Sequence, residues 1–179
     1  MKRMVLGVLA IVCLVSASSL SAQNITFGVA GGLLMPMGDY NTADKPGFIA
    51  GAGVRIPIGT APVAVRLEGT YSQTSHDGVG GKTKIIGGMA SLVYAFQAGG
   101  SVTPYVLGGL GYYNAKVDVT GFGSASESKF GFGGGGGLRF PMGGASLFVE
   151  ARYISVQTSG SALAFVPIIA GVSFGGGAK

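Results

Sequence analysis

The sequence is poor in cysteine, tryptophan, histidine and charge. Its 179 residues include one cysteine, no tryptophan and one histidine, and only 11% of them are charged. Cys13 lies within the first 22 residues, so a chain that has lost this segment can form neither a disulfide nor a cysteine metal site. Soluble domains usually carry about 25% charged residues. The shortage of charge, set against 47% hydrophobic residues, therefore disfavours an ordinary water-soluble domain.

Long hydrophobic runs are also missing after residue 22. A membrane helix needs about 20 consecutive apolar residues, and glycine or polar residues interrupt every apolar stretch from residue 23 onward. Mean hydropathy is nevertheless high, at +0.52. An apolar chain without a spanning helix predicts a membrane β-barrel. The net charge of +5 is scattered, without basic runs, and therefore does not predict nucleic-acid binding.

The first 22 residues have the three parts of a secretory signal. Lys2 and Arg3 supply positive charge, residues 5–15 are apolar, and residues 16–22 are mostly small. Residues 1–22 are therefore predicted to be a cleaved signal peptide, with cleavage before Gln23; cleavage after Ser21 is the alternative. This leaves residues 23–179 as one exported domain.

Eight later segments alternate between apolar and more polar positions, as strands with two different faces do. In residues 63–71, valine, leucine and tyrosine occupy one face, whereas Arg66 and Glu68 occupy the other. The predicted strands cover residues 25–35, 48–58, 63–73, 83–96, 103–116, 129–142, 147–156 and 162–174.

The predicted connections differ in length at the two ends of the strands. Tight turns are expected at residues 59–62 and 143–146, and a moderate one at 97–102. Longer polar loops are expected at residues 36–47, 74–82 and 117–128, with a short polar one at 157–161. Outer-membrane barrels have short periplasmic turns and longer outer loops. The sequence therefore predicts an all-β fold, a closed eight-stranded antiparallel up-and-down transmembrane β-barrel with both chain ends at the periplasmic side.

An internal repeat predicts the strand register. Residues 53–59, Gly-Val-Arg-Ile-Pro-Ile-Gly, resemble residues 137–143, Gly-Leu-Arg-Phe-Pro-Met-Gly. Counting outward from the two turns, we expect Arg55 to lie opposite Arg66 and Arg139 to lie opposite Glu150.

Six charged residues lie well inside the predicted strands, all on the less aliphatic face. They are Arg55, Arg66, Glu68, Arg139, Glu150 and Arg152. An arginine facing lipid near the midplane is unfavourable by about 2–4 kcal/mol, so these side chains should point inward. The third and seventh strands lie on opposite walls, and we expect Arg66 and Glu68 to meet Glu150 and Arg152. The interior of such a barrel is barely wide enough for side chains, which predicts an ionic plug; a gated ion path is the alternative.

Glycine and aromatic residues have predicted places in the wall. The glycines at residues 133–137 are expected to form a narrow, strongly curved wall. Tyrosine and phenylalanine fall near the ends of the predicted strands. Tyr105 and Tyr113 share one face at a spacing that matches two aromatic girdles.

The remaining candidate residues lie near the predicted loops. The run Ser75-His76-Asp77 contains the residue types of a hydrolase triad, but neighbours in sequence rarely converge as a triad requires. We interpret it as a solvated loop. No histidine, cysteine and carboxylate cluster has metal spacing, and no cofactor is expected. Five lysines map to the long-loop rim and are predicted to contact lipopolysaccharide phosphates: Lys45, Lys82, Lys84, Lys116 and Lys129.

Together, these features resemble the small eight-stranded outer-membrane proteins of the OmpA and OmpX type. The resemblance rests on the signal, the alternating segments, the inward charges and an apolar last strand that ends on Phe174. It implies folding by the barrel-assembly machinery. Five residues follow Phe174, where such proteins often end.

The sequence predicts a non-enzymatic protein of the bacterial outer membrane, with a structural or surface-interaction role through the extracellular loops. Expected partners are outer-membrane lipids, lipopolysaccharide and the assembly machinery, with the protein a monomer. The alternatives are a lipid-modifying enzyme, a narrow ion channel and a soluble lipocalin-like barrel.

Overall fold

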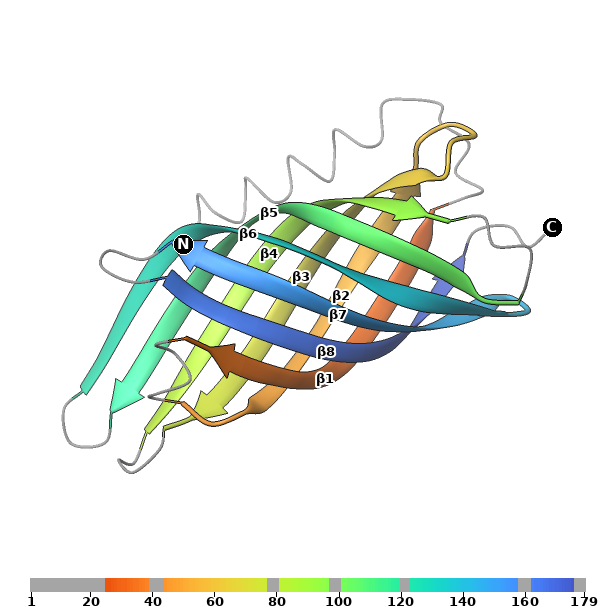
Figure 1. The fold of residues 1–179 in the computed structure, drawn as a ribbon. Helices are drawn as coiled ribbons and strands as arrows, with labels where there is room; N and C mark the ends of the chain where they lie inside the picture. The colour runs from red at the N-terminus through yellow and green to blue at the C-terminus, as the bar shows by residue number, and fades with distance from the viewer. Residues whose placement is uncertain are drawn as a thin grey trace.

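The computed structural model describes residues 25–38, 44–76, 81–96, 101–119, 123–157 and 162–175. Figure 1 shows these residues as a barrel whose strands run obliquely around its axis. The predicted signal peptide and its cleavage site lie outside the described residues. The strands are β1 (Thr26–Met37), β2 (Gly47–Pro57), β3 (Val63–Ser75), β4 (Gly81–Ala95), β5 (Thr103–Val119), β6 (Gly123–Met142), β7 (Ala145–Gln157) and β8 (Ala162–Gly175).

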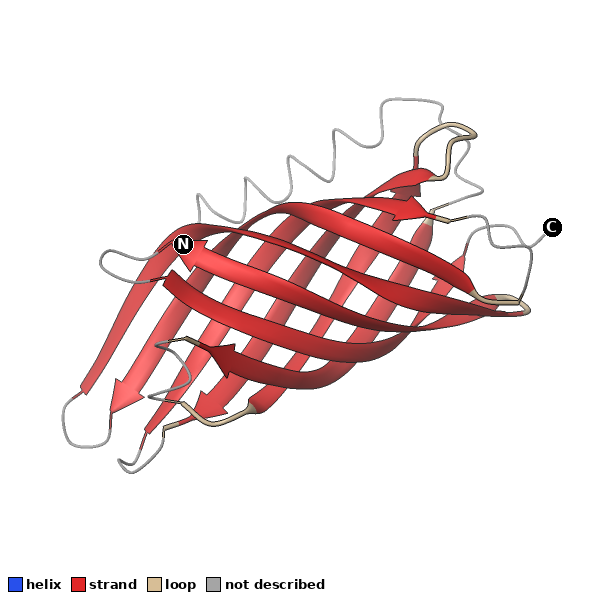
Figure 2. Ribbon diagram, in the orientation of Figure 1, coloured by secondary structure: helices blue, strands red, loops and turns tan. Residues whose placement is uncertain are grey.

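Strand pairing closes the barrel. Each strand pairs antiparallel with the next one, and β1 pairs with β8 from Thr26↔Gly175 to Met37↔Ala164. Closure leaves no open sheet edge in the part of the wall where all eight strands pair. The prediction of a closed, eight-stranded, antiparallel up-and-down barrel is confirmed. Figure 2 shows strands and loops throughout the described segments. Among those segments, no helix is long and apolar enough to cross a membrane.

Side chains alternate between the two surfaces of the wall. In β4, every second residue from Thr83 to Val93 is buried, and those between them from Ile86 to Tyr94 are exposed. The outer surface is aliphatic and aromatic; Leu110 and Phe130 have exposed fractions of 71% and 73%. An outer surface this apolar suits a hydrocarbon environment and would be unfavourable in water.

Two hairpins are longer than the sequence predicts. Most of the predicted loop at residues 117–128 is strand, because β5 continues to Val119 and β6 begins at Gly123. β3 likewise reaches Ser75 and β4 begins at Gly81, which shortens the loop predicted at residues 74–82. The polar residues that predict strand ends in the sequence extend the ladder instead, since a hairpin that leaves the membrane can expose both faces to water.

The register is as predicted at one turn and different at the other. Arg55 lies opposite Arg66, as expected. Arg139 lies opposite Phe148, and Glu150 lies opposite Gly137, so the predicted pairing of Arg139 with Glu150 is wrong. β6 and β7 are joined by only Gly143 and Gly144, with Gly143 at a φ of 64° that favours glycine. The shift of two residues keeps every side chain on its predicted face.

Tyr105 and Tyr113 point into the barrel, and each is 3% exposed. Their predicted place in two outer aromatic girdles is therefore wrong. Lumen glycines provide their space: a Cβ at Gly87 would lie 2.3 Å from the Tyr113 ring, and one at Gly137 would lie 2.6 Å from the Tyr105 hydroxyl. Other aromatic residues near strand ends do face outward, namely Tyr71, Tyr94, Phe96, Tyr153 and Phe174.

Candidate functional site

Two arginine–glutamate pairs cross the lumen. Arg66 on β3 donates from Nη1 to Glu150 Oε2 at 2.8 Å and from Nη2 to Glu150 Oε1 at 3.1 Å. Arg152 on β7 donates in the same two-pronged way to Glu68 on β3, with Nη2–Oε2 at 3.1 Å. Since three strands separate β3 from β7 on either side of the barrel, the pairs connect opposite walls.

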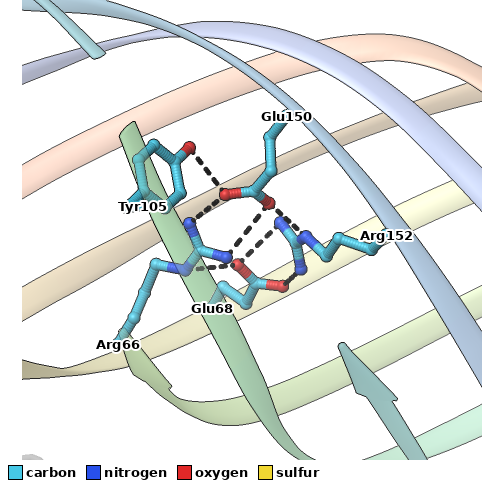
Figure 3. A network of polar contacts seen from close by, with 5 residues as sticks. All are labelled: Arg66, Glu68, Tyr105, Glu150 and Arg152. Atoms are coloured by element: carbon cyan, nitrogen blue, oxygen red, sulfur yellow. Dashed lines mark hydrogen bonds and ion pairs between the residues drawn. The ribbon is translucent and has the colours of Figure 1, made fainter. Parts of the chain in front are cut away.

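Glu150 is the centre of this lumen network, which we define as Arg66, Glu68, Tyr105, Glu150 and Arg152 (Figure 3). The Glu150 side chain is 0% exposed. It accepts hydrogen bonds from Arg66, from Nε of Arg152 and from the Tyr105 hydroxyl, the last at 2.8 Å. Arg66 Nε lies 3.2 Å from Glu68 Oε2, which completes a ring of alternating charges. A buried carboxylate needs such donors, because an unpaired one would be strongly unfavourable.

The other two inward arginines lie outside this ring. The Arg139 guanidinium carbon is 5.5 Å from the centre of the Tyr105 ring, a cation–π arrangement. Arg55 lies opposite Arg66 on the neighbouring strand. No ion pair joins Arg55 or Arg139 to a carboxylate within the described ranges. The structure thus places all six predicted residues inside but brings only four of them together.

Tyr105 is the network member that the sequence did not predict. β5 is apolar or glycine-rich on both faces, so alternation alone does not reveal which face points inward. The available signal is in the neighbouring strand. Gly137 lies opposite Tyr105, and a glycine there leaves room for a large side chain.

His76 belongs to a second buried cluster, at the other end of β3. The hydroxyls of Thr74 and Thr83 donate to Asp44 Oδ1 at 2.6 Å and to Asp44 Oδ2 at 3.2 Å. His76 Nε2 lies 3.2 Å from Thr83 Oγ1 and 3.8 Å from Asp44 Oδ2. The interpretation of His76 as part of a solvated loop is therefore wrong. Its distant partner, Asp44, could not be identified from sequence spacing.

This cluster does not have the geometry of a catalytic triad. In a triad, the nucleophile and the carboxylate contact opposite ring nitrogens of histidine, whereas here one nitrogen, Nε2, faces both groups. Ser75 is exposed on the opposite face of the strand, and Asp77 lies outside the described residues. Within the described segments, no three His, Cys, Asp or Glu residues come together in a way that could hold a metal ion.

A family model described as the outer membrane protein beta-barrel domain matches residues 7–174. The chain belongs to this family. It is a small eight-stranded barrel of the bacterial outer membrane, of the type that the sequence resembles. Lipid and lipopolysaccharide therefore form its surroundings. No curated protein sequence matches the chain significantly.

Several solved structures share the fold of this outer-membrane barrel. Neisserial surface protein A is 18% identical over 84% of this chain and 96% of its own, with a TM-score of 0.68. A major outer membrane protein from Thermus thermophilus is 13% identical over 84% of this chain and 98% of its own, with a TM-score of 0.64. The outer membrane enzyme PagL is 17% identical over 84% of this chain and 99% of its own, with a TM-score of 0.52. Identities this low show the fold alone.

The five predicted rim lysines lie toward the same end of the outer-membrane barrel but do not form one group. Lys84 lies directly opposite Lys116, and Lys82 follows on the same face of β4. These three lysines, the β4–β5 lysine patch, adjoin the exposed apolar side chains of Ile86 and Tyr112. Lys129 pairs with Glu127 at 2.9 Å. Lys45 is separate, on the segment that precedes β2.

Proposed function

We propose that the protein is a non-enzymatic outer-membrane scaffold, with an ionically closed lumen and a surface-interaction role at its outer end. The observation that carries this proposal is the lumen network. An eight-stranded barrel is barely wide enough for its own side chains, and two crossing ion pairs occupy this one. An ion passing through would have to separate buried partners, and breaking a buried pair is unfavourable by about 3–5 kcal/mol.

The β5–β6 hairpin supports the surface-interaction role. β5 and β6 have 17 and 20 residues, whereas about ten suffice to span the membrane. Residues 123–128 are all exposed. The hairpin is held by cross-strand contacts, such as Asn114 Nδ2 to Ser128 Oγ at 2.7 Å. It is thus an ordered, polar projection beyond the apolar band, suited to contact other molecules.

A lipid-modifying enzyme is the competing proposal, since PagL shares the fold. The structure offers one cluster with suitable residue types, around His76. The hydroxyl beside His76 belongs to Thr83, which is 2% exposed. The same ring nitrogen of His76 faces both Thr83 and Asp44. A lipid substrate could not reach this hydroxyl without opening the cluster, which favours a role in joining the segment before β2 to β3 and β4.

Vesicles that contain the purified protein, with lipopolysaccharide in one leaflet, test the proposed function. We expect ion leakage equal to that of protein-free vesicles, because the network closes the lumen. We also expect the lipid A acyl composition to stay unchanged in mass spectra. Stepwise conductance in planar bilayers would contradict the closed lumen. Acyl release that disappears in His76→Ala would contradict the non-enzymatic assignment.

We further propose that the β4–β5 lysine patch binds lipopolysaccharide phosphates. Lys84 and Lys116 lie in directly opposite positions, so their ammonium groups are close enough to contact the same phosphate. The adjoining apolar residues Ile86 and Tyr112 place the patch at the edge of the apolar band.

Replacing Lys82, Lys84 and Lys116 together with glutamine should weaken lipopolysaccharide binding by on the order of tenfold, since each exposed contact contributes about 0.2–1 kcal/mol. Binding to nanodisc-held protein measures this effect. The matched control replaces Lys45 and Lys129, which lie outside the patch, and should change affinity by less than about twofold. Equal losses in both variants would show that only general charge matters.

Assembly as a monomer by the barrel-assembly machinery is part of the same proposal. The β1–β8 pairing closes the wall, so a second copy cannot add a strand at that seam of the described barrel. The last strand, which carries Phe165 and Phe174, supplies one side of that final seam.

A further inference from the structure

The lumen holds more arginine than glutamate. The inward charged residues are Arg55, Arg66, Glu68, Arg139, Glu150 and Arg152. Both carboxylates are engaged by Arg66 and Arg152. Two positive charges, on Arg55 and Arg139, are therefore left without a carboxylate partner in the described strands. A surplus of charge of one sign is unfavourable in an interior of low polarity.

Arg55 is the less favourably placed of these two arginines. It lies directly opposite Arg66, and like charges in opposite positions destabilise a sheet. It is also within electrostatic reach of Arg139. Its Nε is buried and has no hydrogen-bond partner among the residues that the structure describes. Folding normally supplies an acceptor to such a donor.

A cavity lies beside these arginines. Its volume is about 80 Å³, which is room for several water molecules and hence for a small inorganic ion. Much of its lining is apolar, with Ile49, Phe148 and Ile169 among the residues, but four arginines, Glu68 and Thr26 line it as well. The positive groups in the wall are Arg55, Arg66, Arg139 and Arg152.

We propose that this cavity is a binding site for a small phosphate-type oxyanion, held chiefly by Arg55 and Arg139. A tetrahedral oxyanion offers several acceptor oxygens to guanidinium forks, including the unpartnered Nε of Arg55. Its negative charge offsets the surplus of the two arginines. The Thr26 hydroxyl, which also lines the cavity, can donate to the same ligand.

The anion enters from the periplasmic end. Arg55 precedes Pro57, the last residue of β2, and Arg139 precedes Met142, the last residue of β6. Short turns follow both strands, and in outer-membrane barrels the short turns face the periplasm. Both arginines are only partly buried, whereas the side chain of Glu150, in the lumen network, is completely buried. The ligand is therefore free phosphate or a terminal phosphate that reaches in from the periplasm.

Titration of the ¹⁵N-labelled, detergent-folded protein with inorganic phosphate at constant ionic strength tests this site. The side-chain Nε–H signals of Arg55 and Arg139 should shift saturably. Arg55→Gln and Arg139→Gln should each weaken binding about tenfold or more, since each removes charge-assisted hydrogen bonds. Lys45→Gln, a charge removed at the other end of the barrel, should leave the binding curve unchanged. A second titration with glycerol phosphate identifies the source of the phosphate. If the site accepts a terminal phosphate, glycerol phosphate should bind about as tightly as inorganic phosphate. If the site accepts only free phosphate, glycerol phosphate should not bind.

Three outcomes of the titration would overturn the proposal. One is the absence of saturable binding. Another is binding that persists unchanged in the Arg55→Gln/Arg139→Gln double variant. The third is binding of chloride to the site as tightly as phosphate at equal ionic strength, because this would show that the site attracts any anion and does not recognise a phosphate-type oxyanion.

Thermal unfolding provides an independent test, because the shift in unfolding temperature caused by Arg55→Gln should have opposite signs in two buffers. In a zwitterionic buffer of low ionic strength, Arg55→Gln should raise the unfolding temperature, because it removes the like charge opposite Arg66. In phosphate, the same variant should unfold at a lower temperature than the wild type, because it loses the bound anion. Destabilisation in both buffers would overturn the proposal and assign Arg55 a purely structural role.

Discussion

Replacing Glu150 with glutamine is expected to lower the free energy of unfolding of the barrel by about 3–5 kcal/mol, as breakage of a buried ion pair does. The side chain is 0% exposed and accepts from Arg66, Arg152 and Tyr105. Glutamine keeps the size but removes the charge, and one of its two groups is a donor facing other donors. Arg66 and Arg152 would then lose a shared counter-charge inside the barrel.

Urea unfolding in lipid vesicles, followed by heat-modifiable gel migration, measures this loss. Glu127→Gln is the matched control, because Glu127 is an exposed hairpin residue whose pair with Lys129 contributes at most about 1 kcal/mol. An Arg66→Gln/Glu150→Gln double variant should recover part of the loss, since it removes both charges of one pair. Equal stability of Glu150→Gln and the control would show that the network does not stabilise the barrel.

Leu67→Arg should destabilise the inserted barrel by about 2–4 kcal/mol, the penalty of an arginine facing lipid near the midplane. Leu67 lies between Arg66 and Glu68, whose side chains point inward, so residue 67 points outward. It lies near the middle of the outer face of β3, between Val63 and Tyr71. A charge that is accommodated at residue 66 is thus unfavourable one residue later.

The control for this variant is Ser75→Arg, on the same face of β3 but at its end, beyond Tyr71. There the penalty falls to about 0–1 kcal/mol, because the charge reaches water or lipid headgroups. Folding yields into vesicles and urea midpoints compare the two variants. Similar losses in both would mean that the apolar band does not extend between these two positions as the structure implies.

The lumen network was predictable in part because of where its charges lie along their strands. Arg66 and Glu68 alternate with aliphatic residues on β3, as Glu150 and Arg152 do on β7. Because the apolar face of each strand contacts lipid, the charged side chains on the opposite face point into the lumen. The strand order places β3 across the barrel from β7. Tyr105 was not predictable in this way, because β5 has no polar face that distinguishes inside from outside.

Register and long-range contacts were harder to predict for a different reason. The number of residues in the glycine-rich turn after β6 sets whether Arg139 lies opposite Glu150 or Phe148, and the sequence does not show whether that turn has two residues or four. The contact of Asp44 with His76 joins residues from different connections. Nothing in their spacing indicates that contact, since it is the pairing of β2 with β3 that brings the two connections together.

The sequence by itself determined the barrel and the side of the wall on which the six strand charges lie. Both follow from the alternation of side chains along a strand and from the large difference in the free energy of a charged side chain between lipid and a polar interior. Each of these effects acts on one residue at a time. Only the tertiary structure decided which charges pair, which tyrosines turn inward and where a cavity remains. Those outcomes depend on the relative shift of strands and on the volume left by neighbouring glycines, which are properties of the closed barrel as a whole.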